Sequence, residues 1–426
     1  MIPNATDTAS LPPRAAFALP IRVIREGGIT AWLVEDQSVP VVSLEWSWQG
    51  GAALDAPEQV GRMALAFAML TEGAGELNHL AFTDAARDNG IVLQFGAGRD
   101  TASGGFRALR DSLPEAVRLA KLAMTAPRLD APDLDRVRAR SIVAVRQAIE
   151  TPRGAANRAF WAAAYPGHPA GRSATPDSLA AIPREALLQG LSAQLRRDGV
   201  LVGAAGAITE DELRALLREM FAGLPAQAPA PLPSLPAMAD FAPVVEHRPA
   251  PQSSVMFGQE GPLPDDPRWE ATQVALRILG GSGFSSRLMR QVREERGLTY
   301  GIGAGLDVVF GRAVVLGQAS TDNARVAEML GLTREIWARM AADGPLASEL
   351  EEAVDYLNGT LPLQFSDSRR IAGGLLSLMQ NNRTPAWLQG RPARLSALTV
   401  ADVAAAARQF GASPLRVVVA GQPVGL

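Results

Sequence analysis

Residues 285–305 read SSRLMRQVREERGLTYGIGAG and divide at Gly297 into a charged half and a glycine-rich half. Either serine at its start can cap a helix, and Gly297 suits the C-terminal cap, so the pattern predicts a helix that turns into a strand. Arg293 then falls in the last helical turn and Tyr300 at the start of the strand. The reversal between them can aim a guanidinium and a phenol at the same point.

Size and composition favour a globular protein with more than one domain. A chain of 426 residues is too long for one ordinary core, and its 47% hydrophobic and 20% charged residues exclude a disordered chain. The net charge of −3 gives no reason to expect a nucleic acid or an anionic membrane as partner. The absence of cysteine excludes disulfides, thiolate metal sites and a cysteine nucleophile. No apolar run is long enough to span a bilayer.

The N-terminus, MIPNATDTASLPPRAA, shows no apolar core of a signal peptide. This polar, proline-bearing lead-in fits a mature N-terminus from which a signal has been removed, and it equally fits a cytoplasmic protein. We expect a periplasmic protein, with the cytoplasm as the alternative.

A proline-rich segment divides the chain into two halves. Residues 223–251 contain APAPLPSLP and are too rich in proline for a helix or a central strand, which predicts an extended linker. We therefore predict an N-terminal domain over residues 1–222 and a C-terminal domain over residues 252–426. Each half opens on a strand-like segment, residues 41–48 and 254–259, which a loop connects to a helix.

Further landmarks recur in the same order in the two halves. A helix, a proline break and a second helix at residues 119–143 recur at 332–357, and a strand ending at Gly206 recurs as one ending at Gly421. The near-constant separations predict duplicated domains. Strands that alternate, mixed with helices, favour an α+β fold with helices against a largely antiparallel sheet.

Residues 285–305 resemble the C-terminal domain of the pitrilysin and mitochondrial-processing-peptidase family, whose zinc enzymes carry an inverted H-x-x-E-H motif. In that family an Arg and a Tyr in this context bind substrate opposite the zinc, and they match Arg293 and Tyr300. The resemblance covers essentially the whole chain and implies two homologous α/β-roll domains that form half of a clamshell. The alternative for these residues is an ordinary helix–turn–strand with a solvated arginine and a packed tyrosine.

The same comparison implies that the zinc site is missing. In the family the inverted motif lies on a helix after the first long strand, and the corresponding segment here is residues 61–68, GRMALAFA. The two histidines fall on Ala64 and Ala68, and the glutamate falls on Phe67. Two methyl groups and a phenyl ring can neither hold zinc nor act as a general base.

Other residues do not replace the missing ligands. The family's third ligand, a glutamate, maps near Ala144, and residues 136–149 contain no Asp or Glu. His79, His168 and His247 lie far apart, and none has a ligand at helical or turn spacing, which favours isolated surface or satisfied histidines. The sequence therefore predicts no metal and no cofactor in this chain.

Because the chain keeps the Arg/Tyr half of the family's site, we expect the non-zinc subunit of a heterodimeric zinc metallopeptidase, inactive alone. A homologous partner with H-x-x-E-H would hold the zinc and pair with an extended peptide substrate. Arg293 would hydrogen-bond a substrate carbonyl, and Tyr300 would donate to the oxyanion at the partner's zinc site. The alternative is an inert structural or scaffold subunit, like the respiratory-complex core proteins that resemble this family.

Overall fold

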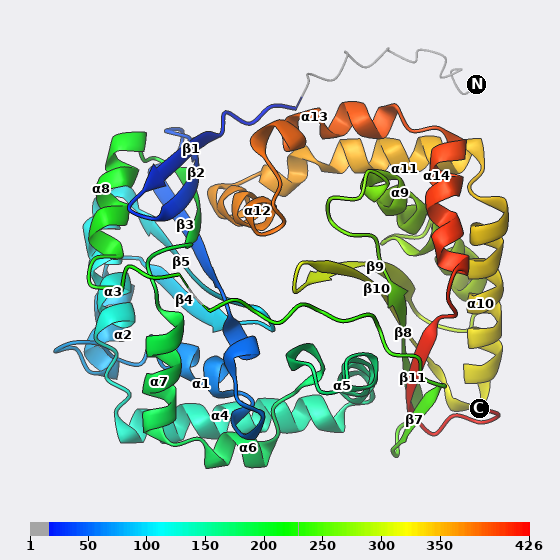
Figure 1. Ribbon diagram of the computed structural model, residues 1–426, viewed down its shortest axis with the longest axis horizontal. Helices are drawn as coiled ribbons and strands as arrows, with labels where there is room; N and C mark the ends of the chain where they lie inside the picture. Colours follow the sequence, from blue (N-terminus) through cyan, green and yellow to red (C-terminus); the bar gives the residue numbers. More distant parts are fainter. Residues whose placement is uncertain (1–16, 229) are drawn as a thin grey trace, which may run out of the picture.

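The computed structural model describes residues 17–228 and 230–426, so residues 1–16, on which the expected localisation rests, lie outside it. Each half of the chain builds one mixed sheet with helices around it (Figure 1). In the described residues no helix has the length and apolar character needed to cross a membrane.

From residue 17 onward, the first half contributes six strands and eight α-helices. Its strands are β1 (Arg22–Glu26), β2 (Ile29–Glu35), β3 (Val41–Gln49), β4 (Val92–Ala97), β5 (Thr101–Leu109) and β6 (Leu201–Gly206). Its helices are α1 (Arg62–Ala68), α2 (His79–Asp88), α3 (Leu113–Thr125), α4 (Ala131–Glu150), α5 (Pro152–Ala164), α6 (Pro176–Ala181), α7 (Arg184–Gln194) and α8 (Glu210–Met220).

The second half contributes five strands, six α-helices and one π-helical segment. Its strands are β7 (Val244–His247), β8 (Gln252–Glu260), β9 (Ile302–Val309), β10 (Arg312–Asp322) and β11 (Arg416–Gly421). Its helical elements are α9 (Trp269–Gly280), η5 (Met289–Glu295), α10 (Val326–Asp343), α11 (Ala347–Thr360), α12 (Ser368–Gln380), α13 (Pro385–Ser396) and α14 (Val400–Ala407).

The two sheets share one strand order. The first runs β1-β2-β6-β3-β5-β4 and the second β7-β11-β8-β10-β9. The pairs β2–β6 and β7–β11 are parallel, and the other neighbouring pairs are antiparallel. Apart from β1, each strand of one sheet therefore has a counterpart in the other. The predicted α+β fold is confirmed, with sheets that are mixed.

One strand lies inside the segment predicted as linker. β7 pairs in parallel with β11 at the edge of the second sheet, so the segment of residues 223–251, for which a helix or a central strand was excluded, contributes a short edge strand. Its four residues stand between Pro243 and Pro249 and contain no proline themselves. An edge strand also needs backbone partners on one side only, which is why so short a strand is tolerated beside prolines.

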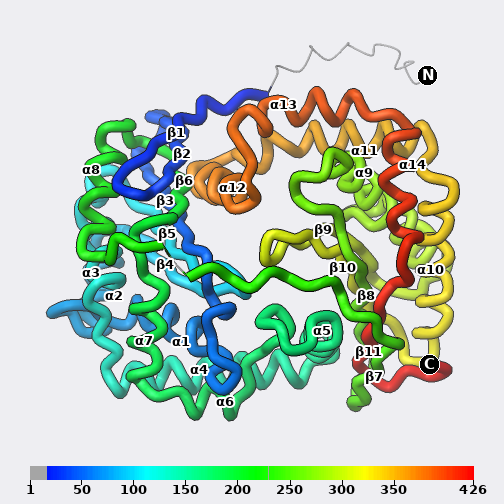
Figure 2. Tube along the Cα trace, in the orientation of Figure 1, coloured from blue at the N-terminus to red at the C-terminus, as the bar shows by residue number. Residues whose placement is uncertain are grey.

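Each half sends one helix onto the sheet of the other half (Figure 2). Helix α5 packs on β8 and β11, where Phe160 and Trp161 are buried against Val418. Helix α12 packs on β2, β3 and β6, where Leu375 is buried against Trp32. The two sheets are thus tied together by hydrophobic burial on both sides of the interior.

A glycine allows the close approach of α12. At Gly203 in the middle of β6, an added Cβ would lie 2.0 Å from the carbonyl oxygen of Ala372, which is backbone and cannot yield as a side chain can. Glycine in a strand interior costs stability and often marks such an approach of another backbone.

The start of α1 is held by a buried carboxylate. The Oδ2 atom of Asp55 accepts a hydrogen bond from the backbone N of Gly61 (2.9 Å), and Oδ1 accepts one from Met63 (3.0 Å). The guanidinium Nε of Arg62 lies 3.6 Å from Oδ1. Burial nevertheless raises the pKa of Asp55 to about 6, although these three groups favour the charged form.

This carboxylate should make stability depend on pH. Because the folded pKa lies above the ordinary value of 3.8, the folded state binds the proton more tightly. The stabilisation is complete below that ordinary value and is lost as the pH rises through about 6. We expect the free energy of unfolding to fall by up to about 3 kcal/mol between these limits.

Chemical denaturation as a function of pH, compared between the wild type and Asp55→Asn, measures this contribution. The variant should be less stable than the wild type at low pH, because an amide cannot accept both backbone bonds. It should also show the weaker pH dependence, and parallel curves would contradict the assignment to Asp55.

Candidate functional site

Helix α1 carries the three positions where the family's zinc enzymes have ligands and base. Ala64 is exposed and Ala68 is partly buried, while Phe67 is 0% exposed. The Phe67 ring packs against Trp48 and Phe95, with ring centroids 6.1 and 6.5 Å away. These positions offer no ligand atom, and the middle one belongs to the hydrophobic core.

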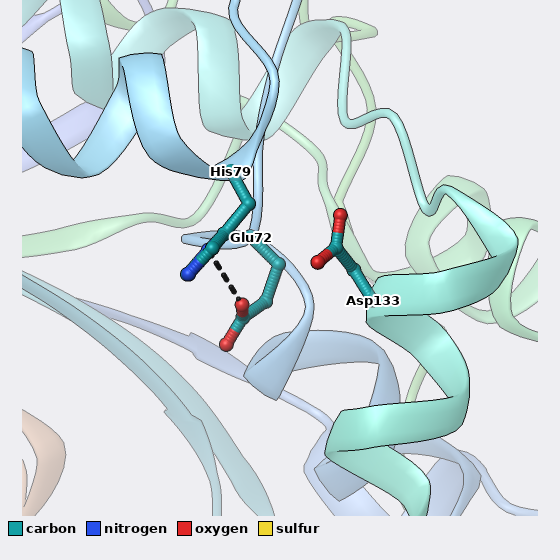
Figure 3. A group of neighbouring side chains, drawn as sticks. All are labelled: Glu72, His79 and Asp133. Carbon is teal, nitrogen blue, oxygen red and sulfur yellow. Dashed lines mark ion pairs between the residues drawn. The ribbon is translucent and has the colours of Figure 1, made fainter.

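The fold brings His79 to two carboxylates that sequence spacing did not reveal. Glu72, His79 and Asp133 each place one potential metal-ligand atom within 4.8 Å of the others (Figure 3). The Oε2 atom of Glu72 lies 2.9 Å from His79 Nδ1 and 2.7 Å from Arg136 Nη2. Arg136 also lies 2.7 Å from Asp133, and Arg140 lies 3.5 Å from Glu72.

These guanidinium groups decide the nature of the cluster. Two positive charges already sit against the two carboxylates, where they would repel a metal ion and neutralise its ligands. The contacts join the loop after α1 to the starts of α2 and α4. The cluster is therefore an ion-pair network, and the zinc positions of α1 are not part of it.

The predicted helix–turn–strand of residues 285–305 is present with a wider helical winding. Its helix is π-helical over Met289–Glu295, and the Ser286 hydroxyl accepts a hydrogen bond from the backbone N of Met289 (3.4 Å). Gly297 ends it with φ of +57°, and its N–H donates to the carbonyl of Arg293 (2.9 Å). Glycine fits this left-handed C-terminal position without strain.

The turn leaves the two predicted site residues accessible. Thr299 is buried and its hydroxyl donates to the carbonyl of Ser320 (2.7 Å), which directs its neighbour outward. Tyr300 is 87% exposed, so the alternative of a packed tyrosine is excluded. The Arg293 guanidinium lies 4.6 Å from the centroid of the Phe284 ring, and neither Arg293 nor Tyr300 makes a side-chain hydrogen bond or ion pair with a described residue.

Both residues line one large cleft. Its volume is about 1320 Å³, and its walls come from the loop after α9, from η5, β8, β9 and β10, and from the junction of α4 and α5. The last wall belongs to the first half of the chain, so both halves shape the cleft. A cleft of this size admits a stretch of peptide, because ligand pockets for small molecules occupy roughly 300–1,000 Å³.

The hairpin that carries β9 is anchored to the first half. At its tip Phe310 and Gly311 both have positive φ, 50° and 71°, as a tight two-residue turn requires. The backbone N of Phe310 donates to Asp100 Oδ2 (2.5 Å). The centroid of the Phe310 ring lies 4.8 Å from the centroid of the His168 ring. Burial lowers the pKa of His168, which favours the neutral ring in this contact.

The sequence did not single out this anchor. His168 Nδ1 accepts a bond from the backbone N of Ala170 (3.1 Å), whereas its buried Nε2 has no hydrogen-bond partner among the described residues. His247 is exposed on β7. The Phe–Gly pair at the hairpin tip is a turn signal that could have indicated it. Asp100 had no local signal, because its partner is far away in the sequence.

Comparisons with known proteins agree with this arrangement. Residues 181–357 match the Peptidase M16 inactive domain. The crystal structure of a peptidase M16 inactive domain from Pseudomonas fluorescens superposes with a TM-score of 0.89, at 25% identity, over 95% of this chain and 98% of that one.

Two curated relatives extend the comparison. An uncharacterized zinc protease of Mycobacterium leprae is 30% identical over 226 residues, which are 51% of this chain and only 50% of that protein. The non-peptidase homolog YmxG of Helicobacter pylori is 21% identical over 351 residues, 82% of this chain and 81% of that protein.

The fold and the altered α1 positions define a peptidase-like protein without a metal-binding motif in α1. The family match, the relatives and the solved structure together support a member of the pitrilysin, or M16, peptidase family without the zinc motif.

Proposed function

We propose that this chain is the non-zinc subunit of a heterodimeric zinc peptidase and contributes Arg293 and Tyr300 to peptide hydrolysis. The observation that carries the proposal is the state of these two side chains. Both line the cleft, Tyr300 is 87% exposed, and neither has a polar partner among the described residues. A pair kept only for architecture would be expected to pack or to form ion pairs.

The chemistry of the two side chains suits different parts of a bound peptide. Zinc in the partner subunit supplies the activated water. The Tyr300 hydroxyl can donate a hydrogen bond to the oxygen on which negative charge develops, and one such donor is typically worth roughly 2.7–4 kcal/mol. The Arg293 guanidinium presents several N–H groups in a fixed fork and can hold a backbone carbonyl of the substrate.

A structural subunit without catalytic function is the second candidate. It is favoured by the methyl groups of Ala64 and Ala68 and by the relative that is called a non-peptidase homolog. It gives no reason, however, for an arginine without an ion pair and an exposed tyrosine that line the same cleft.

Association with a zinc-bearing homologue tests the proposal directly. We expect the purified chain to contain no stoichiometric zinc and to cleave no peptide, because its α1 positions offer no ligand. Mixed with a homologue that carries H-x-x-E-H, it should form a heterodimer that cleaves peptides. An obligate interface of this kind buries about 2,000 Å² or more.

Elemental analysis, sedimentation and peptide cleavage give the three measurements. One tightly held zinc per isolated chain, with activity lost on chelation, would contradict the proposal. So would a chain that stays monomeric with every H-x-x-E-H homologue of its own genome.

A further inference from the structure

The charge of the cleft is one-sided. Among the described residues that line it, Arg153 and Arg293 are the only charged ones, and no carboxylate is present. The chain as a whole contains 44 acidic and 41 basic residues, so a wall of this area would normally contain both signs. The cleft therefore has a positive potential that its own side chains do not neutralise.

Arg153, which lies in the first half of the chain, contributes one of the two positive charges of the cleft. It is the second residue of α5 and is exposed, and its side chain has no hydrogen bond or ion pair with a described residue. Many other arginines are paired, such as Arg287, which lies 2.6 Å from Glu349. Asn157 follows one turn later on the same face of α5 and also lines the cleft, where its amide can add a neutral donor.

Resting on the proposed peptidase function, we propose that the cleft selects peptide segments that contain a carboxylate, and that Arg153 is the residue that binds it. A guanidinium holds a carboxylate through two parallel N–H bonds, which are stronger than bonds to a neutral acceptor. Two unpaired arginines also repel the lysine and arginine side chains of a substrate. Attraction and repulsion together discriminate acidic from basic peptides.

Peptide binding to the full-length chain tests this without the partner. Fluorescence anisotropy would compare labelled peptides, amidated at the C-terminus, that differ only in a central Glu, Gln or Lys. We expect the Glu peptide to bind about three- to tenfold more tightly than the Gln peptide, with the Lys peptide weakest. The preference should shrink as salt is added, because the charges are partly solvated.

Substitutions at Arg153 then assign the preference to one residue. Arg153→Gln should weaken the Glu peptide towards the affinity of the Gln peptide and leave the latter unchanged. Arg153→Glu should shift the preference towards the Lys peptide, which a loss of folding would not do. The matched control is Arg334→Gln, which removes an exposed positive charge from α10, away from the cleft.

The outcomes separate this inference from the proposed function. Equal binding of the Glu and Gln peptides, unchanged in Arg153→Gln, would overturn it whether or not the heterodimer is active. A heterodimer that cleaves nothing, with the preference intact in the isolated chain, would refute the peptidase role alone. A Gln peptide with a free C-terminus that binds as tightly as the amidated Glu peptide would support recognition of a carboxylate from either a side chain or the chain end. One that binds as weakly as the amidated Gln peptide would support recognition of the side-chain carboxylate alone.

Discussion

Replacing Tyr300 by phenylalanine is expected to lower kcat of the assembled peptidase by about 10²–10³, as the removal of other oxyanion donors does. The change deletes one hydroxyl group, and this side chain is 87% exposed and makes no hydrogen bond with described residues. Its removal should alter the free energy of unfolding by no more than about 0.5 kcal/mol. KM should change little, because the hydrogen bond strengthens only as charge develops on the oxygen.

Steady-state kinetics of the reconstituted heterodimer measures this effect, with zinc content and sedimentation of each complex as controls. Arg293 provides the companion variants. Arg293→Ala should raise KM as well as lower kcat, and Arg293→Lys should restore little, because a point charge does not reproduce the guanidinium fork. If the complexes with Tyr300→Phe and with Arg293→Ala both cleave peptide at the wild-type rate, Arg293 and Tyr300 have no part in catalysis. That result would favour the structural subunit without catalytic function.

The accessibility of this pair follows from local sequence signals. Gly297 is needed where the backbone turns left-handed, and it sets the end of the helix whatever the surroundings. The two strand-like segments are strands, β3 and β8, and their patterns of burial are identical. These patterns do not alternate as expected, because α12 and α5 pack on β3 and β8 and residues on both faces are buried. The signals for the helix end and for the two strands depend on neighbouring residues, so a single sequence contains them.

What the sequence could not predict depends on distant partners. The exchange of α5 and α12 between the sheets is an example, since the apolar face of either helix fits any sheet of suitable shape. Arg153 is another example: it contributes a charge to the cleft only because the fold brings α5 to the same cleft as Tyr300. The sequence also did not predict the π-helical conformation of Met289–Glu295, because these residues are ordinary formers of α-helix.

The altered zinc positions differ sharply in how far they have become part of the core. Phe67 is fully buried between Trp48 and Phe95, so Phe67→Glu would remove a large apolar side chain and bury a carboxylate without a partner. Loss of a buried Phe alone costs about 3–5 kcal/mol, and the unpaired charge adds to this. We therefore expect Phe67→Glu to lower the free energy of unfolding by about 4 kcal/mol or more.

Urea denaturation of the isolated chain gives the measurement, and Ala64→His on the same helix is the matched control. Because Ala64 is exposed, its substitution should change stability by no more than about 0.5 kcal/mol. The triple variant Ala64→His, Phe67→Glu, Ala68→His would restore the H-x-x-E-H sequence. We nevertheless expect this variant to be too unstable to fold and bind zinc. A triple variant that folds with wild-type stability and binds one zinc per chain would show that α1 is still a metal-site helix. In that case the core position of Phe67 would not be what keeps this chain free of metal.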